Sequence, residues 1–123
     1  MSERRIARIN SLLQEVITDV VRLHVKDPNL PQFVTITGVS TTRDLGHATV
    51  LVSVLGTATQ KTEALRVLNR AAGFIAQVAS KQVVLRYFPH LVFKIDDALE
   101  YQLRMEETMQ AIKQERQNRV TDA

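Results

Sequence analysis

The sequence predicts one α+β domain of two layers, with helices packed on one face of a small sheet. Two observations support this. Apolar residues recur at three- and four-residue steps over about residues 3–26 and 62–85, which is typical of amphipathic helices. Between these stretches lie Phe33–Thr41 and His47–Leu55, two runs rich in β-branched residues, which is typical of strands. Strands and helices arranged in this order form a sheet with one face covered.

The composition limits the class of protein. At 123 residues and 45% hydrophobic, the chain is long enough for one packed domain and too short for two. Cysteine is absent, which excludes disulfides, thiolate metal sites and a cysteine nucleophile. No apolar run approaches the roughly 18–20 residues of a membrane span. The N-terminus leads into an amphipathic helix rather than a signal-peptide core, so we expect a soluble, cytoplasmic protein.

The first helix has recognisable ends. Ser2 is suited to cap its start, because a serine hydroxyl accepts a hydrogen bond from a first-turn backbone N–H. The sequence Lys26-Asp27-Pro28 ends it, because proline disfavours helical geometry in the preceding residue. Its first turns carry bases where the helix dipole favours acids. These bases are either ligand contacts or ordinary exposed side chains of a chain terminus: Arg4, Arg5 and Arg8.

The two β-rich runs predict an antiparallel hairpin, because the turn residues Asp44 and Gly46 lie between them. In the second run the even-numbered residues 48–54 are all apolar, so one face of the sheet is buried and the other is mixed. Gly38 interrupts the first strand, where a bulge or a closely packed helix would account for it. A third short strand is expected at 91–95.

Gly73 lies inside the second helical stretch. A glycine in a helix interior costs roughly 1 kcal/mol relative to alanine. Its presence indicates either a kink, between a helix over about residues 62–72 and another ending near residue 85, or close approach of another molecule to the backbone. A glycine packed against a neighbouring element is the structural alternative.

Charge is distributed unevenly along a chain whose formal net charge is +3. Residues 61–94 contain six bases and one acid, whereas residues 95–123 contain seven acids and four bases. A basic segment favours an anionic partner, with RNA or DNA as the first candidate. A solvated helix face with incidental charge is the alternative. A last helix is expected from Asp96 to about Lys113, which divides the chain into a domain, 1–113, and a polar, flexible tail, 114–123.

Several short motifs, weak singly, become specific in their order and spacing. They are Arg5-Ile6-Ala7-Arg8-Ile9, Lys26-Asp27-Pro28, Thr35-Ile36-Thr37-Gly38-Val39-Ser40 leading to Arg43-Asp44-Leu45, Ala71-Ala72-Gly73-Phe74-Ile75, Leu85-Arg86-Tyr87-Phe88-Pro89-His90-Leu91 with Phe93, and Arg104-Met105. With these motifs the chain resembles the ribosome-binding factor A family of bacterial 30S ribosome assembly factors, up to about Met109. The resemblance departs at Ala98, where the family usually has a serine whose hydroxyl would cap a helix.

The resemblance implies a type II KH-like domain (α-β-β-α-kink-α-β) with an added C-terminal helix. KH domains clamp the nucleic-acid backbone with a Gly-x-x-Gly loop. This sequence lacks that loop, and the resemblance puts an Ala-x-Gly kink, Ala71-Ala72-Gly73, in its place. It further implies a monomer that binds the 30S ribosomal subunit through 16S rRNA. Its implied role is to assist late 30S maturation and 16S rRNA 5′-end processing, especially at low temperature, without enzymatic activity or a cofactor.

We expect RNA to contact bases in the acid-poor segment, bases at the chain start and hairpin turn, and the backbone of the kink. Charge and position, rather than a fixed motif, select most of them. The expected contact residues are Arg4, Arg5, Arg8, Arg43, Arg66, Arg70, Lys81 and Arg86, with Ala71 and Gly73 at the kink. Of these, we expect Arg66, Arg70, Lys81 and Arg86 to be the main phosphate contacts.

Other classes find less support. His24, His47 and His90 have no metal-ligand spacing, and adjacent Asp96 and Asp97 would point to opposite faces of a strand. These features argue against an enzyme, a metal site and a small-molecule substrate. The alternative is a general KH-like RNA-binding or protein-interaction module without ribosome specificity. Salt discriminates between the two modes of binding, because only RNA binding should weaken steeply as salt rises.

Overall fold

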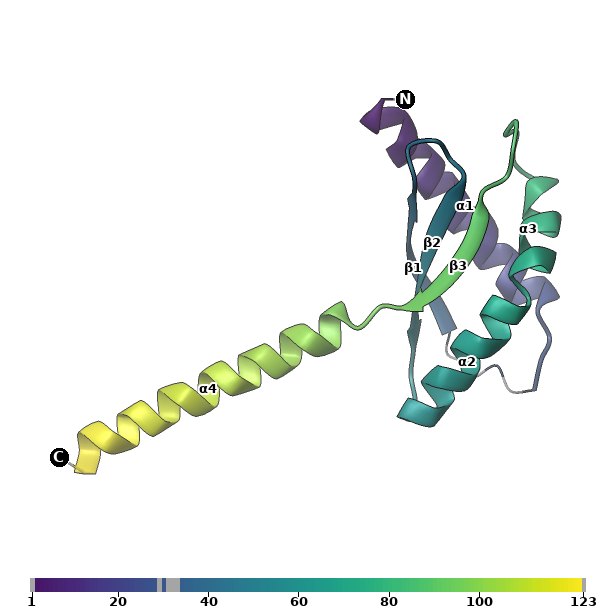
Figure 1. Ribbon diagram of the computed structural model, residues 1–123. Coiled ribbons are helices and arrows are strands. Elements are labelled where there is room, and N and C mark those ends of the chain that lie inside the picture. Colours follow the sequence, from purple (N-terminus) through teal and green to yellow (C-terminus); the bar gives the residue numbers. More distant parts are fainter. Residues whose placement is uncertain (1, 29, 31–33, 123) are drawn as a thin grey trace.

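The computed structural model describes residues 2–28, 30 and 34–122, with side chains at all of these except 99–104 and 118–122. In the described chain, α1, α2 and α3 cover one face of a sheet, and α4 projects away from it (Figure 1). The predicted α+β fold with an added C-terminal helix is confirmed. The elements are α1 (Glu3–His24), β1 (Val34–Thr41), β2 (His47–Val54), α2 (Ala58–Arg70), α3 (Ala72–Ser80), β3 (His90–Ile95) and α4 (Ala98–Asp122).

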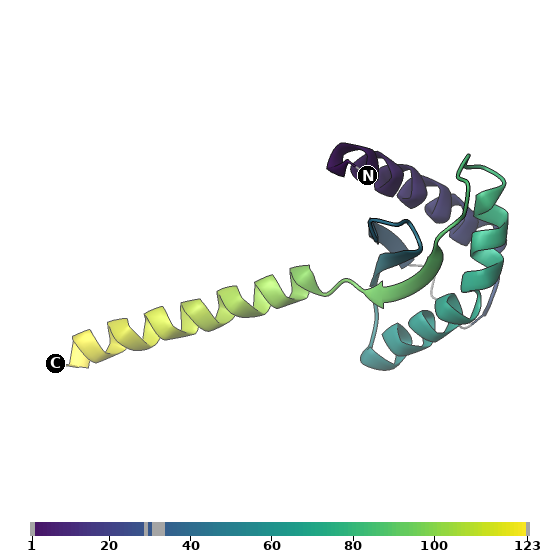
Figure 2. The ribbon, with the colours of Figure 1, turned by 45° about the horizontal axis from the view of Figure 1, so that its top comes forward.

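The sheet has the strand order β1-β2-β3. β1 and β2 form the predicted antiparallel hairpin, and its register shifts between Ile36 and Gly38, which confirms a bulge at that glycine. β3 lies parallel to β2, because the chain crosses over through α2 and α3 before it returns to the sheet. Figure 2 shows the helices on one side of the sheet, and no described element covers the other side.

The core lies between the sheet and its three helices. The even-numbered residues 48–54 of β2 are all buried, as the alternation predicts. The apolar stripe of α1 packs on the sheet, so this surface is already occupied within the domain and is not free to dock a partner. The largest fully buried aliphatic and aromatic side chains come from every layer: Leu13, Ile17, Val20, Val50, Val52, Leu68, Ile75 and Phe93.

The helix ends follow local hydrogen bonding. The predicted Ser2 cap of α1 is confirmed, since its Oγ accepts from the Arg5 N–H at 3.2 Å. α2 begins at Ala58 rather than near residue 62, because Thr57 and Gln60 form a reciprocal capping box. α3 ends at Ser80, earlier than the predicted residue 85. The stretch that follows α3 therefore belongs to the connection with β3.

Amide side chains from the helices hold both edges of the sheet. On the β1 edge, Asn10 Oδ1 accepts from the Thr41 N–H at 3.1 Å and Gln14 Nε2 donates to the Ile36 carbonyl oxygen at 3.4 Å. On the β3 edge, Asn69 bonds both backbone groups of Phe93. Edge strands expose unpaired backbone N–H and C=O groups. Here side chains of α1 and α2 form hydrogen bonds with some of these groups on each edge.

The start of α4 has its own cap. Asp96 Oδ1 accepts from the Ala98 N–H at 3.2 Å, and Asp96 Oδ2 accepts from the Thr37 hydroxyl at 2.7 Å. The aspartate thus supplies the acceptor that a serine at Ala98 would offer, and α4 starts without that hydroxyl. The helix continues to Asp122, beyond the predicted end near Lys113. Within the described part of the chain, none of the helices is both long and apolar enough to cross a membrane.

Candidate nucleic-acid interface

The junction between α2 and α3 is the feature around which the candidate site is built. The break lies at Ala71, with φ −87° and ψ 0°. This is within the Ala71-Ala72-Gly73 kink that the resemblance implies, but two residues before Gly73, where the helical pattern predicts it. Ala71 leaves helical geometry while its carbonyl oxygen already accepts from the Ile75 N–H at 2.8 Å. Gly73 is therefore the second residue of α3. No described side chain caps the start of this helix.

Gly73 faces open space. A Cβ added there would meet no atom within 4 Å outside its own helix and chain neighbours, and the residue is exposed. Packing against a neighbouring element therefore does not explain the glycine, and that alternative is wrong. Its φ does not lie in the left-handed region either. What remains of the sequence-based explanations is close approach of another molecule to the backbone.

Asn69 fixes the junction to the sheet. Its Nδ2 donates to the Phe93 carbonyl oxygen at 3.1 Å, and its Oδ1 accepts from the Phe93 N–H at 2.8 Å. The side chain therefore pairs with β3 as a neighbouring strand would. Because Asn69 lies two residues before Ala71, this pair of bonds anchors the last turn of α2 to β3 beside the junction.

A hollow of about 260 Å³ adjoins the junction. The end of α1 and the residues after it form one wall, with His24, Lys26 and Asp27, and the junction forms the other, with Arg70, Ala71 and Phe74. Phe74 is 48% exposed, which is unusual for a phenylalanine in a helix of a small domain. The hollow thus combines two cations, one carboxylate, a histidine and an apolar ring beside the open backbone at Gly73.

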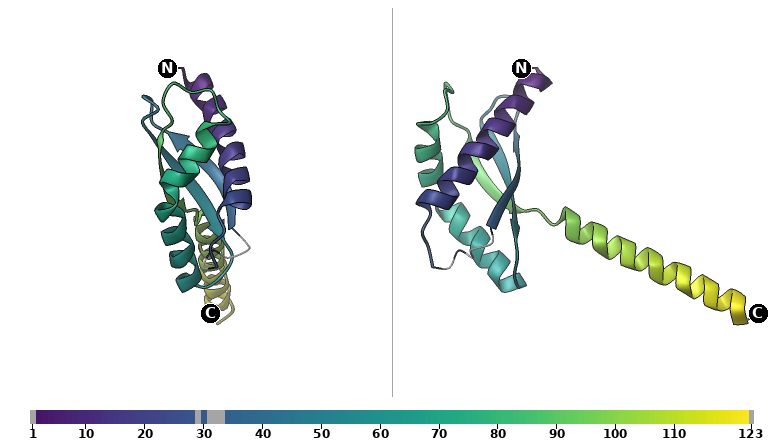
Figure 3. Two further views of the ribbon diagram at one scale, coloured as in Figure 1. Left: turned by 90° about the vertical axis from the view of Figure 1, so that its right-hand side faces the viewer. Right: turned by 180° about the vertical axis from the view of Figure 1, so that it is seen from behind.

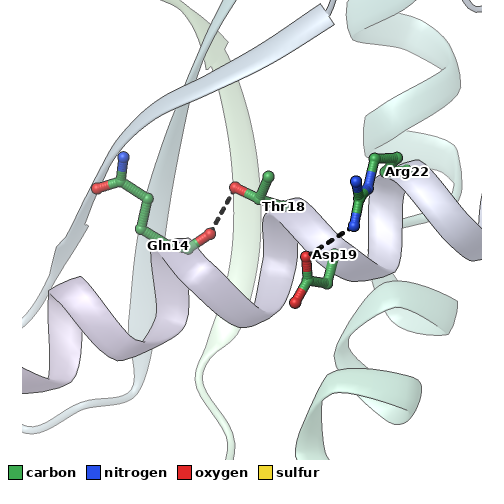
Figure 4. Close-up of polar contacts among 4 residues, drawn as sticks. All are labelled: Gln14, Thr18, Asp19 and Arg22. Atoms are coloured by element: carbon green, nitrogen blue, oxygen red, sulfur yellow. Dashed lines mark hydrogen bonds and ion pairs between the residues drawn. The ribbon is translucent and has the colours of Figure 1, made fainter.

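The outer surface of α1 beside this region has its own internal contacts (Figure 4). Thr18 Oγ1 donates to the Gln14 carbonyl oxygen at 2.6 Å, and Arg22 pairs with Asp19 at 3.4 Å. Thr18 and Arg22 also line a second hollow of about 320 Å³ between α1 and the start of β1. Because the Arg22 charge is already matched by Asp19, this wall is a weaker anion contact than Arg70.

The ten predicted contact residues fall into two groups. The first turns of α1, the β1–β2 turn and the segment that joins α3 to β3 lie at one end of the domain (Figure 1; Figure 3). The predicted basic contact residues on these three segments are all exposed. The structure thus gathers at this end residues distant in sequence: Arg4, Arg5, Arg8, Arg43, Lys81 and Arg86. The other four, Arg66, Arg70, Ala71 and Gly73, lie on α2 and at the junction.

Two of the α2 bases differ in their surroundings. Arg66 forms a two-bond ion pair with Glu63, with its Nη2 2.9 Å from Oε2 and its Nε 3.3 Å from Oε1. This bond lowers the pKa of the exposed Glu63 carboxyl, so the acid stays charged. Among the described side chains, Arg70 has no carboxylate partner. Arg70 is therefore the stronger candidate for a phosphate contact.

Sequence reasoning missed three residues of these surfaces. Lys26 was interpreted only as part of a helix end, Phe74 only as part of a motif, and Tyr87 only as part of a helix break. The signal was present for Phe74, since its position departs from the apolar stripe formed by Leu68, Ala72 and Ile75. Lys26 and Tyr87 become visible only when distant segments meet.

Two of the histidines face each other across neighbouring strands. His47 and His90 are register partners on β2 and β3, with ring centroids 5.9 Å apart in an edge-to-face arrangement. Across the residues that the structure describes, no three histidine, aspartate or glutamate side chains gather in a way that would hold a metal ion. These two rings are one register pair on the exposed face of the sheet.

Comparison with known proteins identifies the family. The family model described as ribosome-binding factor A matches residues 5–109. A ribosome-binding factor A of Protochlamydia amoebophila is 46% identical over 122 residues, which cover 99% of this chain and 93% of that protein. The solution structure of a candidate ribosome-binding factor A from Thermotoga maritima is 32% identical, with a TM-score of 0.68, covering 76% of this chain and 89% of that one.

The fold has a further counterpart in Thermus thermophilus. A homology model of its ribosome-binding factor A, fitted into an electron cryomicroscopy map of a 30S complex, has a TM-score of 0.60 at 24% identity. It covers 72% of this chain and 91% of that one, and the likeness concerns the fold. On the match to residues 5–109 and the 46% identity over nearly the whole chain, this protein belongs to the ribosome-binding factor A family.

Proposed function

We propose that this protein binds the small (30S) ribosomal subunit through its 16S rRNA and assists late maturation of the particle. The proposal includes 16S rRNA 5′-end processing, a larger effect at low temperature and action as a KH-like monomer that is not an enzyme. Its supports are the family name and the Thermus thermophilus relative, whose structure was fitted into a map of a 30S complex.

The open junction is the observation that carries the proposal. A nucleic-acid backbone needs close access to protein N–H groups and cations that are not already neutralised. The α2–α3 junction offers both, since Gly73 has free space above its Cα and Arg70 forms no ion pair with the described side chains. The start of α3 adds the positive end of a helix dipole to the same place.

Electrostatic attraction to phosphate supplies most of the binding free energy in this proposal. Each phosphate neutralised on a single strand contributes roughly 0.7 to the slope of log affinity against log salt. The exposed bases around the junction and at the end of the domain give a broad positive surface. RNA shape, rather than base sequence, would then decide which part of the subunit is bound.

A matched pair of charge reversals tests the proposal. Arg70→Glu with Lys81→Glu changes the predicted interface, and Lys113→Glu with Arg116→Glu makes the same change in net charge on the exposed surface of α4. Co-sedimentation with purified 30S subunits should be much weaker for the first pair and unchanged for the second. The first pair should also reduce the salt slope by about 1.4, from two lost contacts.

Three outcomes would contradict the proposal. Equal losses for the two pairs would show that only overall charge matters. Equal binding of the wild-type chain to 50S subunits would favour the alternative of a general RNA-binding module. Binding to 30S subunits that does not respond to salt would favour a protein-interaction module.

A further inference from the structure

A hollow of about 530 Å³ lies at the end of the domain opposite the β2–α2 loop. The β1–β2 turn, with Asp44 and Leu45, forms one side, and Arg86, Tyr87 and Phe88 of the α3–β3 segment form the other. A backbone bond joins the two sides, because the His90 N–H donates to the Gly46 carbonyl oxygen at 2.9 Å. Its volume is within the roughly 300–1,000 Å³ of small-ligand sites.

Tyr87 presents an aromatic surface in this hollow. The side chain is 74% exposed, and the Arg86 guanidinium lies over its ring, 5.6 Å from the centroid. At this distance the cation is attracted to the ring face. The guanidinium lies on one face of the ring, so the opposite face is the one open to a flat partner. Val84, three residues earlier in the chain, is fully exposed.

The turn opposite Tyr87 has a fixed shape. Asp44 Oδ1 accepts from the Thr42 hydroxyl at 2.6 Å and from the Gly46 N–H at 3.0 Å. These bonds lower the pKa of the Asp44 carboxyl, the Thr42 bond having the larger effect. Leu45 has a positive φ of 58°, which places the turn in a conformation that branched or bulky residues rarely adopt. The carboxylate is thus a charged, positioned acceptor.

This combination selects the chemistry of the ligand. A carboxylate in the hollow repels a phosphate, but it accepts a hydrogen bond from an amino or imino group. An exposed tyrosine ring stacks on any flat base, because every base has a π face. Arg43 and Lys81, on the segments that form the two sides, are available to phosphates outside the hollow.

We propose that this hollow binds one unpaired nucleobase of the RNA, stacked on Tyr87 and hydrogen-bonded to Asp44. The contact rests on the proposed function, since it requires an RNA ligand, and it adds a base-reading contact to binding that otherwise depends on phosphates. It is separate from the α2–α3 junction, because α3 lies between them.

Tyrosine fluorescence tests the contact directly, because the chain has no tryptophan and two tyrosines. In a full-length Tyr101→Phe variant, Tyr87 is the sole emitter. A single-stranded adenosine heptamer should quench its emission, because stacking on a base quenches tyrosine. A heptamer of the same ribose-phosphate backbone without bases should bind through its phosphates and leave the emission unchanged.

Substitutions separate stacking from a structural role. Tyr87→Ala should weaken binding of the adenosine heptamer about 5- to 150-fold, the range that corresponds to stacking on one base, and should leave binding of the abasic heptamer unchanged. Tyr87→Phe should restore the affinity. Leu55→Ala is the matched control, because Leu55 is 71% exposed in the loop at the other end of β2 and should have no effect.

The outcomes distinguish this contact from the proposed function. If the chain co-sediments with 30S subunits but no oligonucleotide changes the Tyr87 emission, the base site is wrong and the proposed function stands. Equal quenching by the abasic heptamer would also overturn the base site. If Tyr87→Ala lowers 30S binding without affecting any RNA, the surface takes a protein, which contradicts the proposal. A wild-type chain that binds neither subunits nor RNA refutes both.

Discussion

Replacing Gly73 with alanine should make the domain more stable and its RNA binding weaker. The residue has helical neighbours on both sides in α3, and an added Cβ meets nothing within 4 Å. Alanine is favoured over glycine by about 0.8–1.0 kcal/mol in a helix interior. Gly73 lies in the first turn, so we expect about 0.5 kcal/mol, which corresponds to a rise in Tm of roughly 2–4 °C for a domain of this size.

Binding should change in the opposite direction. The free space above Gly73 is what a phosphate backbone would occupy, and a methyl group there holds the backbone away, as a side chain does in glycine-dependent phosphate sites. Gly73→Leu fills more of the space and should lower the affinity for 30S subunits at least about tenfold, or 1.4 kcal/mol. Thermal unfolding followed by circular dichroism and 30S co-sedimentation measure the two effects on the same samples.

A neighbour on the same helix provides the control for Gly73. Gln77 is exposed on α3, and Gln77→Ala should leave both Tm and binding close to wild type. Higher stability together with unchanged binding in both Gly73 variants would refute the role of this glycine in ligand contact. Lower stability of Gly73→Ala would instead show that the space above the residue is needed by the fold itself.

Two other residues yield predictions. Asn69→Ala should destabilise the domain by about 1–2 kcal/mol, because it removes two hydrogen bonds to Phe93, and it should reduce 30S binding. Denaturant unfolding of Asn69→Ala, with the exposed variant Gln77→Ala as the control, measures the loss of stability. Equal unfolding midpoints for the two variants would contradict the prediction. Asp96 has its pKa lowered from 3.8, chiefly by Thr37. A carboxyl group whose pKa is lower in the folded than in the unfolded chain stabilises the fold at pH values above its unfolded pKa. That stabilisation is lost as the pH falls through the folded pKa. Thr37→Val should therefore raise the Asp96 pKa in an NMR titration of its carboxyl carbon, and an unchanged value would contradict the assignment.

Local patterns predicted the elements whose causes are local. The alternation in residues 48–54 identified the buried face of β2, the Ser2 hydroxyl identified the start of α1, and Gly38 identified a bulge. Each rests on neighbours within a few positions in sequence. The fold class followed from the order of these elements, because few arrangements cover one face of a small sheet.

The helical pattern by itself placed the kink at Gly73, whereas the resemblance placed it within Ala71-Ala72-Gly73, where it lies. Gly73 is the residue whose type suggests a break, yet the helix breaks at Ala71. Alanine is a strong helix former, so its residue type gives no signal of a break. The last turn of α2 is anchored 24 positions away, where the backbone of Phe93 bonds Asn69. A contact between residues so far apart in sequence leaves no signal in the periodicity of the helical pattern. The hollow at Tyr87 could not be predicted for the same reason, because its two sides come from distant segments that the Gly46–His90 backbone bond joins.

Helix α3 relates the two proposed contacts to each other. It has nine residues, Ala72–Ser80, which is about 13 Å at 1.5 Å per residue. Its first turn carries the open backbone at Gly73, and its end leads into the segment that carries Tyr87. Sites separated by more than roughly 7–10 Å usually contribute independently to binding. The junction would then supply affinity through phosphate, the hollow would add a base contact, and the rigid helix between them would fix the spacing that an RNA strand must match.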